Sequence, residues 1–466
     1  NYSMVICKIM LLIGGIVLEF LIFPTPEDIK FDILAGKFKR AEHKIKERIE
    51  HKIPKGLNKK LHFELYRIVL LKKAYSISEK EAYNILKKKV KNLTKGEFKQ
   101  LMKNGILDWM YVNDTPYFEK RFDSNLFFNY PHFKERQKID KNTKLTQKRR
   151  NIINKAITRL IDGGKPKTYE IQAKITLKRE HPSDTKVRVW LPFPKEEFQQ
   201  SDVKLISASH DVKIAPNSVG QRTVYMEGKD NEEFYVEFSY KIHEWIGFDG
   251  LYKNKPSSED LSEKLPHIRF TPYLWNLIDL IFHDENIENV SDIAKARRIY
   301  DFVTLNVNYS YVLPYAIYDN IPEYVATVFK GDCGFQALLF ITLCRMVGVP
   351  AKWQSGWSIT SIGASSHDWA IIYLEDYGWV PVDLSFGGGR KDNEDLRLFY
   401  FTNLDGFRMF ANTEFQGDFE PRKISWRLDP YDNQTGEMEI ITKEEDGYVI
   451  DLESKIEVLK FQPCKK

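Results

Sequence analysis

Cysteine is the residue that this chain has least of. Four cysteines occur among 466 residues, and no two of them have the spacing of a C-x-x-C pair. So few cysteines exclude a disulfide scaffold, and a zinc or iron–sulfur cage is not expected without such a pair. The sequence therefore predicts neither a metal nor another cofactor. The four residues are Cys7, Cys333, Cys344 and Cys464.

Long apolar runs are also scarce, and a content of 42% hydrophobic and 29% charged residues excludes disordered and multi-span membrane proteins. One apolar stretch, residues 4–23, is close to the roughly 20 residues that cross a bilayer. Glu19 within it would be costly in hydrocarbon. Residues 1–25 are interpreted either as a signal-anchor of a membrane-bound, extracytoplasmic protein or as an apolar helix packed inside a cytoplasmic one.

The small net charge of +5 conceals an uneven distribution along the chain. Residues 1–167 contain 37 Lys and Arg against 18 Asp and Glu, whereas residues 168–466 contain 33 against 47. Domains usually run to roughly 100–200 residues, so this chain is expected to form several. The division of charge predicts that its two parts have different roles.

The basic part has a helical pattern, with leucine and isoleucine recurring every three or four residues over 61–71. We expect a basic helical domain at 26–133 and a basic helical linker at 134–167, which holds 12 Lys and Arg against 3 Asp and Glu. Such a surface could bind an anionic membrane or cell-wall polymer, although a solvated helical face is the plainer interpretation. No recognition motif accompanies it, so no specific nucleic acid is predicted as a partner.

The hydrophobic period changes to two after residue 168. The segments YEIQAKITLK, KVRVWLPFP and EFYVEFSYKIHEW alternate apolar and polar residues, as half-buried strands do. Several such runs within about 80 residues are typical of a β-sandwich, which we place at 168–250. Helical patterning returns over 257–306, so the sequence predicts an α+β protein.

Cys333 occupies an unusual position. Gly331 and Asp332 are typical of a turn and a helix start, and the residues after Cys333 are apolar up to Gly348. The thiol is therefore expected in the first turn of a buried helix, where free N–H groups lower its pKa. Because the thiolate is the reactive form, Cys333 is the candidate nucleophile. Cys344, deeper in the same helix, is interpreted as structural.

A predicted hairpin follows this helix, in SSHDWAIIYLEDYGWVPVDLSF, with its turn in Glu375–Gly378. The midpoint of His367 and Asp383 is residue 375, so antiparallel pairing sets these two side chains roughly opposite each other. A histidine beside a carboxylate is held in one tautomer and is stabilised as imidazolium. Packed against the helix of Cys333, this pair would complete a Cys–His–Asp triad.

The segments GDCGFQALLFITLCRMVGVPAKWQSGW and HDWAIIYLEDYGWVPVD resemble the transglutaminase-like superfamily, whose members share a papain-like fold. The resemblance is specific over 290–410 and looser over 168–246, which is similar to the β-sandwich of bacterial members. It implies that 251–466 form the catalytic domain with a C-terminal β extension. It also implies that Cys333 is the nucleophile, His367 the general base and Asp383 its orienter.

Further site residues follow from the same resemblance. Tyr309 or Tyr311 would help the Cys333 backbone N–H to bind the oxyanion. Asp368 stands where relatives more often carry a small or neutral residue, and it would either point away from His367 or tune it. Asp405 with Arg408 is interpreted as a structural ion pair. Tryptophans that could contact substrate, about half of them expected to be core, are Trp353, Trp357, Trp369 and Trp379.

The sequence thus predicts cysteine-dependent acyl transfer on amide or peptide bonds through a thioacyl-enzyme, with a peptide or protein as substrate. Hydrolysis by a protease or amidase is the first expectation, and protein-glutamine transglutaminase activity is the second. The alternative is a catalytically silent module that retains the fold and binds peptide or cell wall, with the basic part as its anchor.

Overall fold

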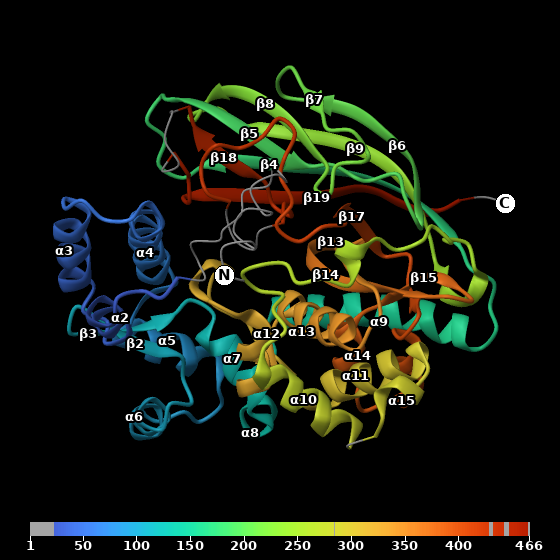
Figure 1. Ribbon diagram of the computed structural model, residues 1–466, viewed down its shortest axis with the longest axis horizontal. Helices are drawn as coiled ribbons and strands as arrows, with labels where there is room; N and C mark the ends of the chain where they lie inside the picture. The colour runs from blue at the N-terminus through green and yellow to red at the C-terminus, as the bar shows by residue number, and fades with distance from the viewer. Residues whose placement is uncertain (1–22, 284, 428–431, 442–446, 465–466) are drawn as a thin grey trace, which may run out of the picture.

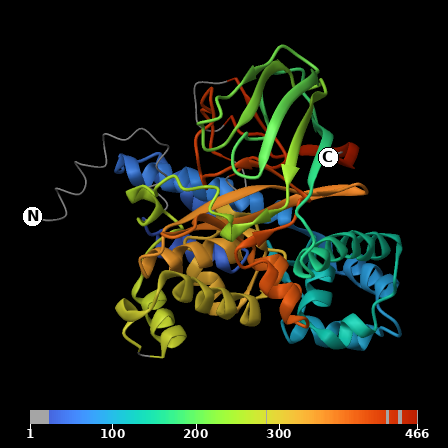
Figure 2. The same cartoon turned by 90° about the vertical axis from the view of Figure 1, so that its right-hand side faces the viewer.

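The computed structural model describes residues 23–283, 285–427, 432–441 and 447–464. A β-sandwich lies over a four-stranded sheet, a group of helices packs beneath that sheet, and the N-terminal helices stand to one side (Figures 1 and 2). The predicted α+β class is confirmed.

The N-terminal part is a helical module with a small antiparallel sheet of order β1-β3-β2. The Ser78–Glu81 capping box starts α5, as the pattern of Ser and Glu three residues apart predicts. The elements of this module are α2 (Glu27–Leu34), α3 (Phe38–Ile49), α4 (Lys55–Ala74), β1 (Tyr75–Ser78), α5 (Glu79–Lys89), α6 (Lys95–Lys103), β2 (Trp109–Val112), β3 (Thr115–Glu119), α7 (Phe122–Asn129) and α8 (Pro131–Glu135).

The apolar stretch 4–23, the candidate signal-anchor within 1–25, lies outside the described residues apart from Phe23. Among the residues that the structure describes, no helix combines the length and apolar character needed to cross a bilayer.

The basic stretch 134–167 contains a long helix, α9 (Lys141–Ile161), which buries Ile153 and Ile157 against the rest of the protein. Arg149 in this helix donates a hydrogen bond of 3.0 Å to the backbone oxygen of Ser358. Arg150 binds the backbone oxygen of Gly389. These two arginines of the basic run are therefore engaged in packing α9 onto the protein.

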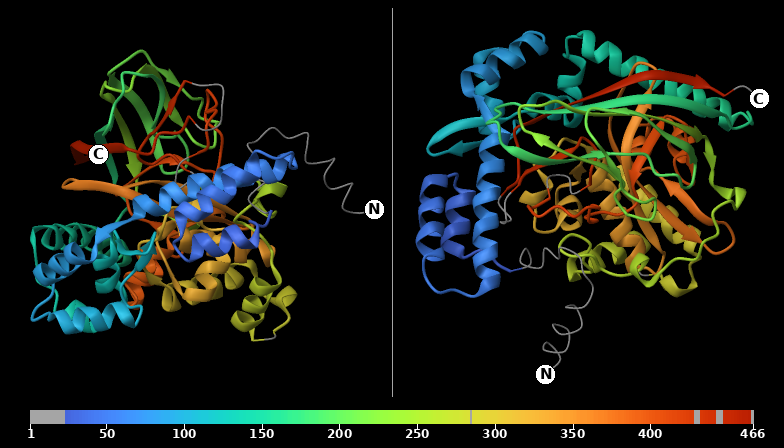
Figure 3. Two further views of the ribbon diagram at one scale, coloured as in Figure 1. Left: turned by 90° about the vertical axis from the view of Figure 1, so that its left-hand side faces the viewer. Right: turned by 90° about the horizontal axis from the view of Figure 1, so that it is seen from above.

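The sandwich consists of two antiparallel sheets, of order β18-β5-β8-β7 and β19-β4-β9-β6. Strands β18 and β19 belong to the C-terminal β extension, and β19 pairs with β4 along most of its length, as Figure 3 shows from above. The chain therefore returns to complete the sandwich after the other sheet and its helices. Its strands are β4 (Thr168–Arg179), β5 (Lys186–Pro192), β6 (Gln200–Ala208), β7 (Lys213–Ile214), β8 (Thr223–Lys229), β9 (Phe234–His243), β18 (Glu437–Ile440) and β19 (Leu452–Pro463).

The third four-stranded sheet has the order β15-β14-β13-β17 and is antiparallel throughout. Short pairs join β10 to β16 and β11 to β12. Its strands and the short ones are β10 (Trp245–Ile246), β11 (Asn308–Tyr309), β12 (Lys330–Gly331), β13 (Ala351–Thr360), β14 (Gly363–Leu374), β15 (Gly378–Val382), β16 (Asn403–Leu404) and β17 (Arg408–Asn412).

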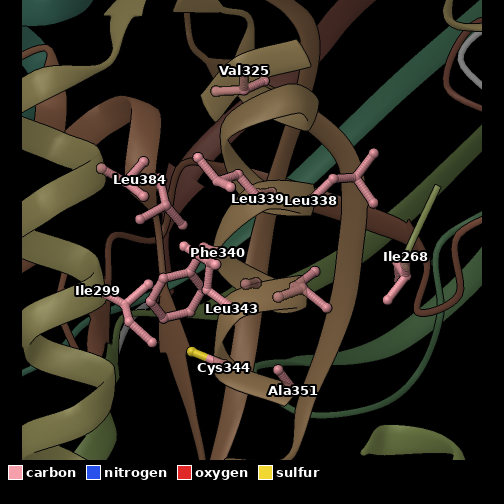
Figure 4. Close-up of a cluster of buried hydrophobic side chains, with 14 of the residues drawn as sticks. Ile268, Ile299, Val325, Leu338, Leu339, Phe340, Leu343, Cys344, Ala351 and Leu384 are labelled. Atoms are coloured by element: carbon pink, nitrogen blue, oxygen red, sulfur yellow. The ribbon is translucent and has the colours of Figure 1, made fainter. Parts of the chain in front are cut away.

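Helix α13 (Cys333–Met346) is buried along its whole length and forms the centre of the main core (Figure 4). Leu338 and Phe340 pack there with Ile299 of a neighbouring helix and with Ala370 of β14. A helix apolar on every side must be covered on every side, and the surrounding elements do this. They are α10 (Pro272–Phe282), α11 (Asp292–Asn306), α12 (Ile321–Val328) and α14 (Leu384–Gly388), together with β13 and β14. Helix α15 (Glu394–Phe399) packs farther out, on α14 and α9.

Candidate active site

Cys333 is the first residue of α13, as the turn signals before it predict. The Asp332 carboxylate caps the helix by accepting a hydrogen bond of 3.0 Å from the backbone N–H of Phe335. Cys333 is 8% exposed, so little of it reaches the surface, whereas Cys344 in the same helix is completely buried. Of the two, only Cys333 lies at a helix end next to polar groups.

The partner of the Cys333 thiol is Asp368. The sulfur donates a hydrogen bond of 3.0 Å to Asp368 Oδ2, and both residues are buried. Burial and then the carboxylates of Asp368 and Asp332 raise the pKa of the thiol well above its ordinary value. The expectation that the helix N-terminus lowers this pKa is therefore wrong for the site as it stands, because burial and negative neighbours outweigh the helix.

His367 and Asp383 meet as the hairpin arithmetic predicts. His367 Nε2 and Asp383 Oδ2 are 2.7 Å apart, and both side chains are buried. The turn spans 375–377 and Leu374 pairs with Gly378, so the register differs from the predicted one by a small shift. Odd-numbered residues of both strands still share a face, and Asp383, just past β15, reaches His367 diagonally.

Arg408 also contacts Asp383, whereas the sequence predicts an ion pair of Arg408 with Asp405 alone. Its guanidinium is fully buried, with Nη1 2.8 Å from Asp383 Oδ2 and Nη2 3.1 Å from Asp405 Oδ2. Burial would raise the pKa of Asp383, but His367 and Arg408 outweigh it and hold that pKa well below its ordinary value. Burial lowers the pKa of His367 and Asp383 opposes this, so the imidazole favours its neutral form.

The thiol and the imidazole lie on opposite faces of β14. Successive side chains of a strand point to opposite sides. Asp368 is therefore on the same face of β14 as Ala370, which packs on α13. His367 is on the other face of β14 with Trp369, whose ring centre lies 5.7 Å from that of the imidazole. Among the residues that the structure describes, Cys333 and His367 therefore share no hydrogen bond. The structure brings together His367 with Asp383, and Cys333 with Asp368.

The two candidate tyrosines lie in different places. Strand β11 pairs in parallel with β12 and sets Tyr309 beside Gly331, two residues before Cys333. Burial and then Cys333 raise the pKa of Tyr309 well above its ordinary value, so it lies within electrostatic reach of the thiol. Tyr311 instead packs under the guanidinium of Arg121, 4.6 Å from the ring centre, in the N-terminal module. Tyr309 is thus the one nearer the Cys333 thiol.

Trp357 and Trp369 are both completely buried. Trp357 stacks on Phe238 of the sandwich, with 5.7 Å between the ring centres. Trp369 donates a hydrogen bond of 2.6 Å to Gln354 and lies under the guanidinium of Arg408. In this structure both indoles fill space between elements and are not exposed to contact a substrate.

The described residues contain no group of three or more His, Cys, Asp or Glu side chains arranged to hold a metal ion. The carboxylates closest to the thiol are those of Asp332 and Asp368, and their hydrogen bonds go to other protein groups. Tyr315 donates to Asp332 at 2.9 Å, and Gln434 donates to Asp368. The carboxylates of Asp332 and Asp368 therefore both have hydrogen-bond partners within the protein.

Comparisons with known proteins agree with this fold. Residues 285–384, which contain Cys333, His367 and Asp383, match the transglutaminase-like superfamily, so the chain contains a domain of this superfamily. A candidate cysteine protease from Cytophaga hutchinsonii is similar in structure, with 15% identity, a TM-score of 0.40, and coverage of 65% of this chain and 95% of that one.

The periplasmic domain of TgpA from Pseudomonas aeruginosa, bound to ethylmercury, is also similar, with 13% identity and a TM-score of 0.27. That match covers 50% of this chain and 94% of the other. At these TM-scores the superpositions carry no functional conclusion. The comparison with curated proteins gives no significant match.

Proposed function

We propose that this protein catalyses cysteine-dependent acyl transfer on amide or peptide bonds, with Cys333 as nucleophile, His367 as general base and Asp383 as its orienter. The observation that carries the proposal is the buried contact of 2.7 Å between His367 and Asp383. His367 lies on β14, and the next residue of that strand, Asp368, accepts the hydrogen bond of the Cys333 thiol. A buried imidazole kept neutral beside a carboxylate is suited to accept a proton and to be stabilised afterwards.

In the proposed reaction the Cys333 thiol leaves Asp368 and gives its proton to His367. The two groups lie on opposite faces of β14 in this structure, so the transfer requires the site to rearrange first. The sulfur attacks the amide carbonyl carbon, so that a C–S bond forms, and the C–N bond then breaks as the nitrogen takes the proton from the imidazolium. Water next attacks the thioester and releases a carboxylic acid and the free thiol. An amine in place of water gives a new amide, and hydrolysis is the outcome that we propose first.

The negative charge on the carbonyl oxygen needs a donor. The Cys333 backbone N–H at the start of α13 is one, because the first N–H groups of a helix have no partner within it. The Tyr309 hydroxyl is the second donor that we propose, since Tyr309 is the candidate tyrosine that lies close to the thiol. Tyr309→Phe is therefore expected to slow acylation while leaving alkylation of the thiol unchanged.

Trapping of the acyl-enzyme from a peptide library tests the proposal. The wild type is expected to give a mass adduct on the peptide that contains Cys333, and Cys333→Ala is expected to give none and to lose turnover. His367→Gln is expected to reduce acylation by about two to four orders of magnitude. Cys344→Ala, which removes a buried thiol in the same helix, is the matched control. Turnover that persists in Cys333→Ala would refute the mechanism.

One observation favours a second function, a binding module that keeps the fold without its chemistry. The thiol is bonded to a carboxylate, which disfavours the thiolate, and it shares no hydrogen bond with His367 among the described residues. Peptide binding that is equal in the wild type and in Cys333→Ala, together with no adduct on Cys333 of the wild type, would support this alternative.

A further inference from the structure

Three C-terminal residues, Asp432–Gln434, lie across one face of β13, and we call them the cover segment. Asp432 Oδ2 accepts a hydrogen bond of 3.2 Å from Trp353 Nε1 and a second one from the Ser355 hydroxyl. The backbone oxygen of Gln434 accepts one of 2.7 Å from Trp357 Nε1. The three donors are two residues apart along β13, so they form a row on one face of the strand.

The cover segment also joins the two β layers. The side chain of Asn433 donates a hydrogen bond of 2.9 Å to the backbone oxygen of Trp190 in β5 of the sandwich. Its own backbone oxygen accepts one of 3.1 Å from Asn412 at the end of β17. In the sequence the segment falls between β17 and β18, which lie in the lower and upper layers of Figure 1. It therefore fills the junction between these two layers.

A chain of hydrogen bonds connects the cover segment to Cys333. The Gln434 amide donates to Asp432 at 3.0 Å and also to Oδ1 of Asp368, whose Oδ2 accepts from the Cys333 thiol. Asp432, Asn433 and Gln434 are at most 4% exposed. The segment thus covers the carboxylate that accepts the hydrogen bond of the thiol, and every residue in this chain of contacts is buried, with Cys333 the most exposed at 8%.

The row of donors on β13 fits an extended chain. The donors are side chains on the face of an interior strand, and their spacing of two residues equals the repeat of an extended chain, so carbonyl or carboxylate oxygens of such a chain can meet them in turn. In the structure, oxygens of the cover segment satisfy all three donors. A peptide placed on the same row would lie beside the Cys333 sulfur, where an acyl group must bind if the proposed function holds.

We propose that the cover segment occupies the groove of an extended peptide substrate and keeps Cys333 closed, so that substrate must displace it. The inference rests on the proposed function for the identity of the ligand, but not for the closure itself. Displacement breaks the bond between Gln434 and Asp368, opens Asp368 to water and exposes the thiol. No covalent step is involved.

Alkylation by iodoacetamide, located by mass spectrometry, measures the closure without any turnover. In Gln434→Ala and in Asp432→Ala, Cys333 is expected to react roughly tenfold faster or more than in the wild type, because each change removes buried hydrogen bonds that oppose local opening. Gln200→Ala removes a buried amide bonded to the backbone of Lys195 and Phe410, and it serves as the matched control. The proposal is overturned if both variants leave the Cys333 rate within about twofold of the wild type, or if Gln200→Ala raises it equally.

The wild type supplies a second measurement that does not depend on the folding of any variant. In low urea, Cys333 is expected to react by local opening, with a rate that depends weakly on urea, while the fully buried Cys344 reacts only as the domain unfolds. An equal, steep urea dependence for both cysteines would overturn the proposal. If Cys333 is alkylated faster in the variants but no protein forms a peptide adduct, the result supports the closure of Cys333 by the cover segment and refutes the acyl-transfer function.

Discussion

Asp383→Asn tests how the buried charges behind His367 hold the site together. In the structure the Asp383 carboxylate accepts hydrogen bonds from His367 at 2.7 Å and from the backbone N–H of Phe386 at 2.9 Å, and it is paired with Arg408 at 2.8 Å. An asparagine has nearly the same shape but no charge. The substitution therefore leaves the Arg408 cation in the interior with Asp405 as its remaining carboxylate.

Removal of one partner of a buried ion pair costs roughly 3–5 kcal/mol, because the other charge stays desolvated. Arg408 keeps its contact with Asp405 at 3.1 Å, so the lower end, about 3 kcal/mol, is the expected loss for Asp383→Asn. If the cost comes from the lost contact between Asp383 and Arg408, the two substitutions must be non-additive, because each of them breaks the same contact. The double variant Asp383→Asn/Arg408→Met is therefore expected to be less destabilised than the sum of the two single variants by more than about 1 kcal/mol, although both proteins that lack Arg408 leave Asp405 without its cation.

Protection of Cys344 from alkylation is the assay, because this thiol is completely buried in the core that Figure 4 shows. A loss of about 3 kcal/mol corresponds to alkylation faster by roughly two orders of magnitude when opening precedes reaction. The single variants and the double variant are compared in one buffer. If the double variant is as unstable as the sum of Asp383→Asn and Arg408→Met, the two charges do not act as a pair and the reasoning fails.

Three other predictions concern stability measured by urea unfolding. Leu338→Ala in the main core is expected to cost about 2–5 kcal/mol, and a cost below about 1 kcal/mol would contradict its place there. Arg149→Met removes the bond to the backbone of Ser358 and is expected to cost about 1–3 kcal/mol, whereas the exposed Lys148→Met is expected to cost less than about 0.5 kcal/mol. Burial opposes the ionisation of Asp230, but its hydrogen bonds outweigh this and lower its pKa to about 2. Its pKa in the folded state lies below the unfolded value, so ionised Asp230 stabilises the fold. The wild type is therefore expected to be more stable than Asp230→Asn above about pH 4 and to lose this difference as the pH falls towards 2. A difference in stability that does not depend on pH would contradict this.

Local patterns predicted the parts of this fold that local physics decides. The capping residues Ser78 and Asp332 each begin a helix in the structure, because a side-chain oxygen there satisfies a free N–H of the first turn. The hairpin brought His367 to Asp383 although its register is shifted, because residues of equal parity on two antiparallel strands still share a face. The prediction that His367 and Asp383 meet therefore holds even though the position of the turn was slightly wrong.

Long-range pairing was beyond such arithmetic. Strand β19 pairs with β4, which lies more than 270 residues earlier in the sequence. Neither strand has a sequence feature that predicts pairing with the other. The cover segment was missed for the same reason, since Asp432 and Gln434 are ordinary polar residues until the chain folds back on β13. The choice of face for α13 was also hidden, because Ala370 and Ile372 on one side of β14 are as apolar as Trp369 and Ile371 on the other. Parity showed which residues share a face, but not which face the helix covers.

The state of the thiol follows from the relative size of two effects. A helix N-terminus stabilises a nearby negative charge by roughly 0.3–1 kcal/mol at the surface and somewhat more when partly buried. Full burial shifts a pKa by up to about 3–5 units, and each unit corresponds to about 1.36 kcal/mol. The helix cannot therefore ionise Cys333 while Asp368 and the cover segment exclude water from it. If water or a substrate enters, the thiol is less desolvated while the helix N-terminus stays beside it, so the start of α13 can favour the thiolate only after the site has opened. Under this reasoning, access to the groove, and not the intrinsic acidity of the cysteine, decides when Cys333 can react.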